Sequence, residues 1–81
     1  MPANPDIEYM VRGPESFGMA VREFRLREGL TQSELAKRAN IHRTYLSLLE
    51  TGTTTEALKN LMRVLSVLDL EIVIGPKQPK Q

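Results

Sequence analysis

The residues best suited to recognition chemistry gather in the segment IHRTYLSLLE, residues 41–50. Arg43, Thr44 and Ser47 fall at i, i+1 and i+4, which places them on one side of a helix. An arginine fork can donate two hydrogen bonds to O6 and N7 of guanine, and a hydroxyl can bond a base edge or, in threonine, touch a thymine methyl. His42 stands just before them, where a helix N-cap is expected. The pattern predicts a surface that reads bases, made of Arg43, Thr44, Ser47 and His42.

Three further side chains are suited to DNA phosphates. Thr31 and Gln32 stand at the start of an earlier helical pattern, where free amides and the positive end of the helix dipole favour an anion. Gln32 could equally be an ordinary exposed helix residue. Tyr45 can stack on the DNA backbone or pack beside the following helix, and the sequence leaves both open. We therefore expect phosphate contacts from Thr31, Gln32 and Tyr45.

Positioning these residues requires two short helices joined by a tight turn within residues 30–52. Thr31 followed three positions later by Glu34 predicts a capping box at the start of the first helix. Asn40 is suited to the left-handed position that ends that helix, and Gly52 to the position that ends the second. Leu35, Ala36 and Ala39 of the first helix, and Ile41, Leu46 and Leu49 at the second, are expected to face the core.

The flanking sequence predicts the remaining elements. Gly13-Pro14 begins a helix whose apolar stripe ends before Gly29, and Thr53 with Glu56 suggests a second capping box that starts a last helix. That last helix is expected to be a core element through Leu58, Leu61, Met62, Leu65 and Leu68. Alternation over residues 7–12 and the β-branched run at 70–74 predict two strands. The predicted organisation is an N-terminal arm with a strand (1–12), a helical domain (13–69), a C-terminal strand (70–75) and a disordered tail (76–81).

Composition limits the function classes. The chain has 81 residues, 41% apolar and 26% charged, with no cysteine and a single histidine, His42. Disulfides and thiolate metal sites are excluded, and one histidine cannot form a metal cluster, so we expect neither metal nor cofactor. No long apolar run or leader pattern is present, which predicts a soluble cytoplasmic protein, associated with the nucleoid and without a membrane partner.

The charge is unevenly distributed. The net charge is only +1, but residues 22–43 carry +3 and the remainder −2. A basic segment of this kind suits an anionic partner or is simply a solvated helix surface. Enzyme activity is not expected, because the chain has no glycine-rich phosphate loop and no convincing set of paired carboxylates.

The residues Thr31-Gln32, Leu35-Ala36, Ala39, Ile41, Ser47, Glu50 and Gly52 resemble the Xre family of helix-turn-helix proteins, which includes the lambda-type repressors and Cro. The resemblance covers residues 17–68. It implies a mainly α, four-to-five-helix lambda repressor-like domain and a buried ion pair between Arg25 and Glu50. Asn40 and His42 depart from the family's common turn glycine and cap serine or threonine.

The end of the chain, RVLSVLDL running into a strand, is similar to HipB-like antitoxins, whose C-terminal strands pair across a dimer. This resemblance implies a homodimer that binds a palindromic operator in double-stranded DNA, with a HipA-like kinase toxin as a further partner. Its dimerisation residues would be Leu70, Ile72, Val73 and Ile74. The two predicted strands could pair within the chain, or the C-terminal strand could pair between chains; we favour the second, alone or together with the first.

The sequence thus predicts a DNA-binding repressor, more finely an autoregulating antitoxin of a toxin-antitoxin pair. A stand-alone or phage-type regulator is an alternative. A protein-interaction module with weak DNA binding is another, although Arg43 and Gln32 argue against it.

Overall fold

The computed structural model describes residues 8–53 and 55–77, and side-chain hydroxyls cap the starts of two of its helices, at Gln32 and Glu56. The order of elements is β1 (Tyr9–Val11), α1 (Pro14–Arg27), α2 (Gln32–Ala39), α3 (Arg43–Glu50), α4 (Glu56–Val67) and β2 (Ile72–Ile74). The mainly helical class with a short strand at each end is confirmed. No helix in the described ranges is long and apolar enough to cross a membrane.

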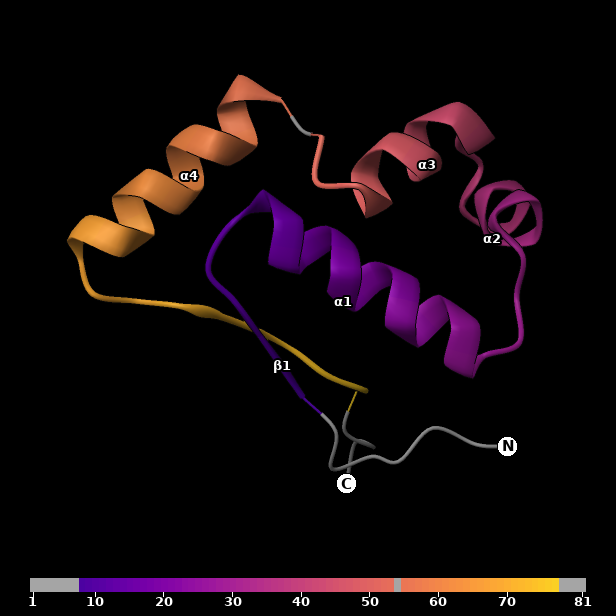
Figure 1. Ribbon diagram of the computed structural model, residues 1–81, viewed down its shortest axis with the longest axis horizontal. Coiled ribbons are helices and arrows are strands. Elements are labelled where there is room, and N and C mark those ends of the chain that lie inside the picture. The colour runs from indigo at the N-terminus through magenta and orange to yellow at the C-terminus, as the bar shows by residue number, and fades with distance from the viewer. Residues whose placement is uncertain (1–7, 54, 78–81) are drawn as a thin grey trace.

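The two strands pair with each other in an antiparallel ribbon, with Tyr9 opposite Ile74 and Val11 opposite Ile72. Pairing of the C-terminal strand with a second chain stays a prediction, whereas pairing within the chain is observed. The physical reason is that β1 and β2 can both turn alternate side chains toward the same core. Figure 1 shows the ribbon passing along one side of α1, with α2 and α3 on the other side. The early part of the predicted arm and the end of the predicted tail, 1–7 and 78–81, lie outside the described residues.

The core forms between this ribbon, α1 and α4. Val11, Ala20 and Met62 are buried, and the partly buried side chains packed on them are Tyr9, Phe17, Leu58, Ile72 and Ile74. Tyr9 also meets Phe24 edge to face, with ring centroids 5.3 Å apart. Ile72 and Ile74, predicted to serve dimerisation, therefore pack in their own chain's core. Val73 and Leu70 remain exposed.

Helix α1 approaches α3 closely at Gly18. A Cβ added there would overlap the carbonyl oxygen of Leu49 and lie 2.9 Å from the carbonyl carbon of Glu50. Only a residue without a side chain allows the two backbones to come this near. This contact fixes where the end of α3 lies on α1.

One local expectation is wrong, and another holds only in part. Helix α4 is capped by Thr55, whose hydroxyl accepts a hydrogen bond from the Leu58 amide, rather than by Thr53. Thr53 instead belongs to the end of α3, where its amide donates to the Leu48 carbonyl. Of the five residues expected to make α4 a core element only Met62 is buried, because the helix packs through one edge of its apolar face.

Candidate nucleic-acid interface

The start of α2 is built by a capping box. The Thr31 hydroxyl accepts a hydrogen bond from the Glu34 amide at 3.0 Å, and the Glu34 carboxylate accepts one from the Thr31 amide at 2.9 Å. The bond from the Thr31 amide to the carboxylate is the main cause that lowers the pKa of Glu34, and the Thr31 side chain adds to it. The amides of Gln32 and Ser33 follow at the first turn, where no helix carbonyl precedes them to accept a bond. The predicted cap is confirmed, and it leaves a helix end able to face an anion.

The turn between α2 and α3 depends on Asn40. This residue adopts the left-handed conformation, with φ 57° and ψ 44°, as the sequence predicted. The Ile41 amide then bonds to the Ala36 carbonyl at 2.9 Å. Ala36 and Leu46 are each 2% exposed and hold the two helices together. The prediction that Ala39 and Ile41 face the core is wrong: both are exposed, because the turn lies at the edge of the molecule.

The structure brings the predicted base-reading residues together on one side of α3. Arg43 and Thr44 are exposed and Ser47 is partly buried, while Leu46 and Glu50 point into the interior. His42 is the N-cap, and its side chain makes no capping hydrogen bond. Tyr45 is 54% exposed on the flank of this face. The side chains that the sequence grouped by periodicity therefore do share a surface.

Leu48 was not among the predicted contacts. It follows Thr44 by one helical turn and is 48% exposed on the same face. An apolar side chain there can touch a thymine methyl. The only sequence signal for this contact was the helical periodicity, which places Leu48 on the outer face of the helix.

Arg25 and Glu50 form a buried, bidentate ion pair between α1 and α3. Arg25 Nε donates to Glu50 Oε2 at 2.7 Å and Nη2 donates to Oε1 at 2.9 Å, while Nη1 donates to the Leu30 carbonyl at 2.8 Å. Both residues are largely buried, at 9% and 6% exposed. The hydrogen bonds with Arg25 hold the pKa of Glu50 below its ordinary value, and those with Glu50 raise the pKa of Arg25. Here the geometry matches the pairing that the family resemblance implied.

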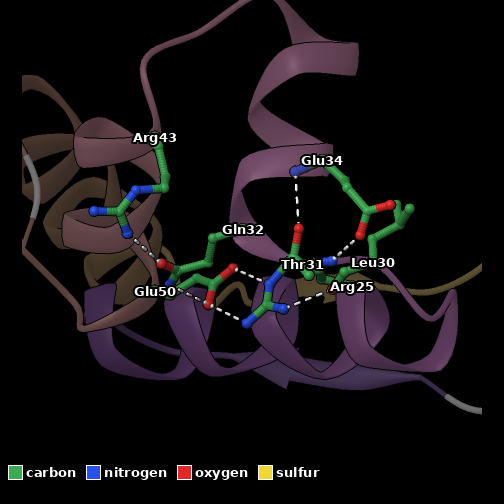
Figure 2. Close-up of polar contacts among 7 residues, drawn as sticks. All are labelled: Arg25, Leu30, Thr31, Gln32, Glu34, Arg43 and Glu50. Carbon is green, nitrogen blue, oxygen red and sulfur yellow. Dashed lines mark hydrogen bonds and ion pairs between the residues drawn. The ribbon is translucent and has the colours of Figure 1, made fainter.

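The ion pair continues as a chain of polar contacts to the surface (Figure 2). Gln32 Nε2 donates to Glu50 Oε1 at 3.1 Å, and Gln32 Oε1 accepts from Arg43 Nη1 at 3.4 Å. Gln32 is therefore a link between a buried carboxylate and an exposed guanidinium. No sequence signal identified this link, because Gln32 at the start of α2 contacts both the last residue and the first residue of α3.

Ion pairs reduce the exposed positive charge that the sequence indicated for residues 22–43. Arg25 is neutralised inside the fold, and Arg27 lies 3.6 Å from Glu23. The basic residues of this segment that the structure leaves exposed are Arg22, Lys37, Arg38 and Arg43. The positive surface is thus smaller than residue counting suggests. Among the described residues no group of acidic, histidine or cysteine side chains could hold a metal ion.

Comparison with known proteins settles the family. A family model described as helix-turn-helix matches residues 21–74. The chain belongs to the helix-turn-helix family. Similar proteins include Control protein C.BamHI of Bacillus amyloliquefaciens, 36% identical over 56 residues that cover 68% of this chain and 69% of that protein. Another is the uncharacterized HTH-type transcriptional regulator y4dL of Sinorhizobium fredii, 34% identical over 64 residues. The match covers 79% of this chain but only 33% of y4dL.

Within this helix-turn-helix protein, α2 and α3 are the two helices of the motif and Asn40 lies in its turn. The matched region also contains α4 and β2. The chain is therefore an Xre-like helix-turn-helix protein.

Proposed function

We propose that this protein is a transcriptional regulator that binds double-stranded DNA with α3 in the major groove. The observation that carries the proposal is the exposed Arg43 at the N-terminus of α3, steadied by Gln32 and flanked by Thr44. The major groove admits an α-helix, and side chains at the start of that helix reach base edges. The relatives' names, a control protein and a transcriptional regulator, support the same proposal.

Arg43 is the proposed principal base contact. A guanidinium has five N–H donors, and the described contacts of Arg43 use only one nitrogen, Nη1. The remaining donors can grip guanine with two parallel bonds, which discriminates by ~1–3 kcal/mol. Thr44 and Ser47 would add contacts on the same face, and His42 would lie at its edge.

Phosphate contacts would fix the register of α3. We propose that the free amides at the start of α2, together with Thr31, Gln32 and Tyr45, face the DNA backbone. The side-chain amide of Gln32 is already held by Glu50, so it would lose little conformational freedom on contacting a phosphate.

The test begins with binding sites selected from a random double-stranded DNA library. Arg43→Ala should weaken binding to the selected site about 5- to 150-fold, as expected for one bidentate contact, with a much smaller loss on random DNA. Fluorescence anisotropy measures both affinities. Arg63→Ala is the matched control, because Arg63 is an exposed arginine on α4. An equal loss on both DNAs would make Arg43 a phosphate contact, and selection without enrichment would refute sequence-specific binding.

We also propose that the protein acts as a homodimer on a palindromic operator. A two-fold dimer places two recognition helices ~34–36 Å apart, one turn of B-DNA, and each copy then reads one half-site. Footprinting of the selected site tests this, since a single unrepeated half-site would contradict it.

A finer proposal is that the protein is a HipB-like antitoxin that regulates its own operon. Its support is the resemblance of residues 63–70 running into a strand, and β2 does follow α4 directly. A pull-down with the full chain, combined with inspection of the neighbouring reading frames, tests the idea. Without a kinase-like partner in either, a stand-alone or phage-type regulator is the better description.

A further inference from the structure

Helix α4 has an apolar face wider than its own core covers. One edge packs inward through the buried Met62 and the partly buried Leu58 and Leu65. The adjacent edge is uncovered: Leu61, Val64 and Leu68, the C-cap of the helix, are 48%, 55% and 60% exposed. Ala57, one turn before Leu61, is exposed as well. We name these four residues, Ala57, Leu61, Val64 and Leu68, the α4 seam.

The α4 seam carries no charge. Helical spacing of about 100° per residue places the charged residues of α4 on the opposite flank, and these are Glu56, Lys59 and Arg63. Two of them are paired there, since Lys59 Nζ lies 3.7 Å from Glu56 Oε1. An uncharged apolar strip is unsuited to DNA phosphates or a charged peptide, but it suits an apolar protein surface.

The spacing of the α4 seam reads the same in both directions. Its members are separated by four, three and four residues, the spacing of a seam between two packed helices. An antiparallel copy related by a two-fold axis would therefore present the same spacing. Ala57 would lie opposite Leu68 of the second copy, and Leu61 opposite Val64. A larger side chain thus meets a smaller one at each level, as even packing requires.

We propose that the α4 seam is the surface on which a second copy of this chain docks, with the two α4 helices antiparallel. A two-fold contact uses the same patch on both subunits, which a palindromic seam satisfies. A chain of 81 residues buries little surface by itself, so this contact would also complete its core. Figure 1 shows α4 at the opposite end of the molecule from α2 and the start of α3, so docking leaves Arg43 accessible. The role given to this dimer, the binding of a palindromic operator, rests on the proposed function.

The first test compares two valines on the same helix. Val64→Asp puts a carboxylate in the seam twice per dimer, whereas Val67→Asp puts it on a side chain that is 86% exposed and points away from the seam centre. Sedimentation velocity without DNA should show that Val64→Asp raises the dimer Kd at least ~100-fold, while Val67→Asp leaves it close to wild type. Circular dichroism should show the same helix content in all three proteins, because both valines are exposed in the single chain.

The second test fixes the direction of the helices. The chain has no cysteine, so disulfides report only on introduced ones. In one α4, residues 57 and 68 lie ~16 Å apart, well beyond the ~7 Å that a disulfide can span. The double variant Ala57→Cys/Leu68→Cys should therefore oxidise to a covalent dimer, and neither single variant should.

Three outcomes would overturn the proposal. The wild-type chain could sediment as a monomer at every concentration, or the single cysteine variants could cross-link as readily as the double one. The dimer could also survive Val64→Asp and dissociate on Val73→Asp, which would place the contact on the exposed face of the β1–β2 ribbon. None of these measurements uses DNA. Failure of the selected site to bind would contradict the proposed function and leave the α4 dimer standing.

Discussion

Breaking the Arg25–Glu50 pair from either side should cost much of the stability of the fold. In Arg25→Met the Glu50 carboxylate keeps only the 3.1 Å bond from Gln32, and in Glu50→Leu the Arg25 guanidinium keeps only the Leu30 carbonyl. Each variant leaves a buried charge without its counter-charge. The double variant Arg25→Met/Glu50→Leu removes both charges and replaces them with apolar side chains of similar length.

The expected magnitudes follow from that geometry. Removing one partner of a buried ion pair costs ~3–5 kcal/mol, whereas replacing both with apolar residues is often neutral or stabilising. A chain of 81 residues has an unfolding free energy on the order of 4–12 kcal/mol. Each single variant should thus lose a large part of its stability, with Tm falling by about 12 °C or more. The double variant should recover most of it.

Urea denaturation followed by circular dichroism measures all four proteins and closes the double-mutant cycle. Protein concentration should be held constant, because a dimer contributes to the measured stability. If both single variants lie within 1 kcal/mol of wild type, the pair is not the tie between α1 and α3 that its distances indicate. A double variant as unstable as the singles would show that the lost packing, rather than the unpaired charge, is what matters.

Three further predictions concern the same framework. The pKa of Glu50 is lowered in the fold, so the stability that its ionised carboxylate contributes is fully present above the unfolded pKa of ~4.3 and is lost as pH falls through the lower folded pKa. As pH is lowered from 7 to 3, the urea midpoint should therefore drop more steeply for wild type than for the Arg25→Met/Glu50→Leu protein. Gly18→Ala should lower the free energy of unfolding by ~1–3 kcal/mol in urea titrations, because the added Cβ clashes with α3. At Gly13 an added Cβ meets nothing within 4 Å, so Gly13→Ala should change the free energy of unfolding by only a few tenths of the Gly18→Ala effect. Thr31→Ala should cost ~1 kcal/mol by the same assay, because the Glu34 amide loses its acceptor.

Each of these has a result that contradicts it. Parallel pH profiles for the two proteins would show that Glu50 does not contribute through its ionisation. Equal effects of the two glycine substitutions would mean that α1 and α3 are not in backbone contact. An unchanged midpoint for Thr31→Ala would remove the capping box as the start of α2.

The local signals in the sequence were reliable where one residue decides one backbone feature. Thr31 with Glu34 predicted the start of α2, Asn40 predicted its left-handed end, and Pro14 predicted the first residue of α1. The interaction in each case spans a few residues, so no distant part of the chain can alter it much. The wrong cap at α4 came from the run of three threonines at 53–55, in which each position offers the same hydroxyl.

The residues of the candidate site could be predicted from the sequence better than the contacts between them. Arg43, Thr44 and Ser47 share a face because helical periodicity alone puts them there. The link from Glu50 through Gln32 to Arg43 was not predictable, because it depends on how α2 crosses α3. The pairing of β2 with β1 was not the arrangement that the sequence favoured, since two strands of suitable pattern carry no mark of whether they belong to one chain or two.

By itself, then, the sequence determined which segments are helices and strands, where the capped ends of α1 and α2 lie, and which polar side chains α3 presents. These properties depend on period and on capping, which are short-range. Only the tertiary structure decided that β1 pairs with β2, that Gly18 lets α1 touch α3, and that one edge of α4 stays uncovered. Those outcomes depend on which surfaces fit together, and the burial of apolar area that drives them is set by the whole chain at once.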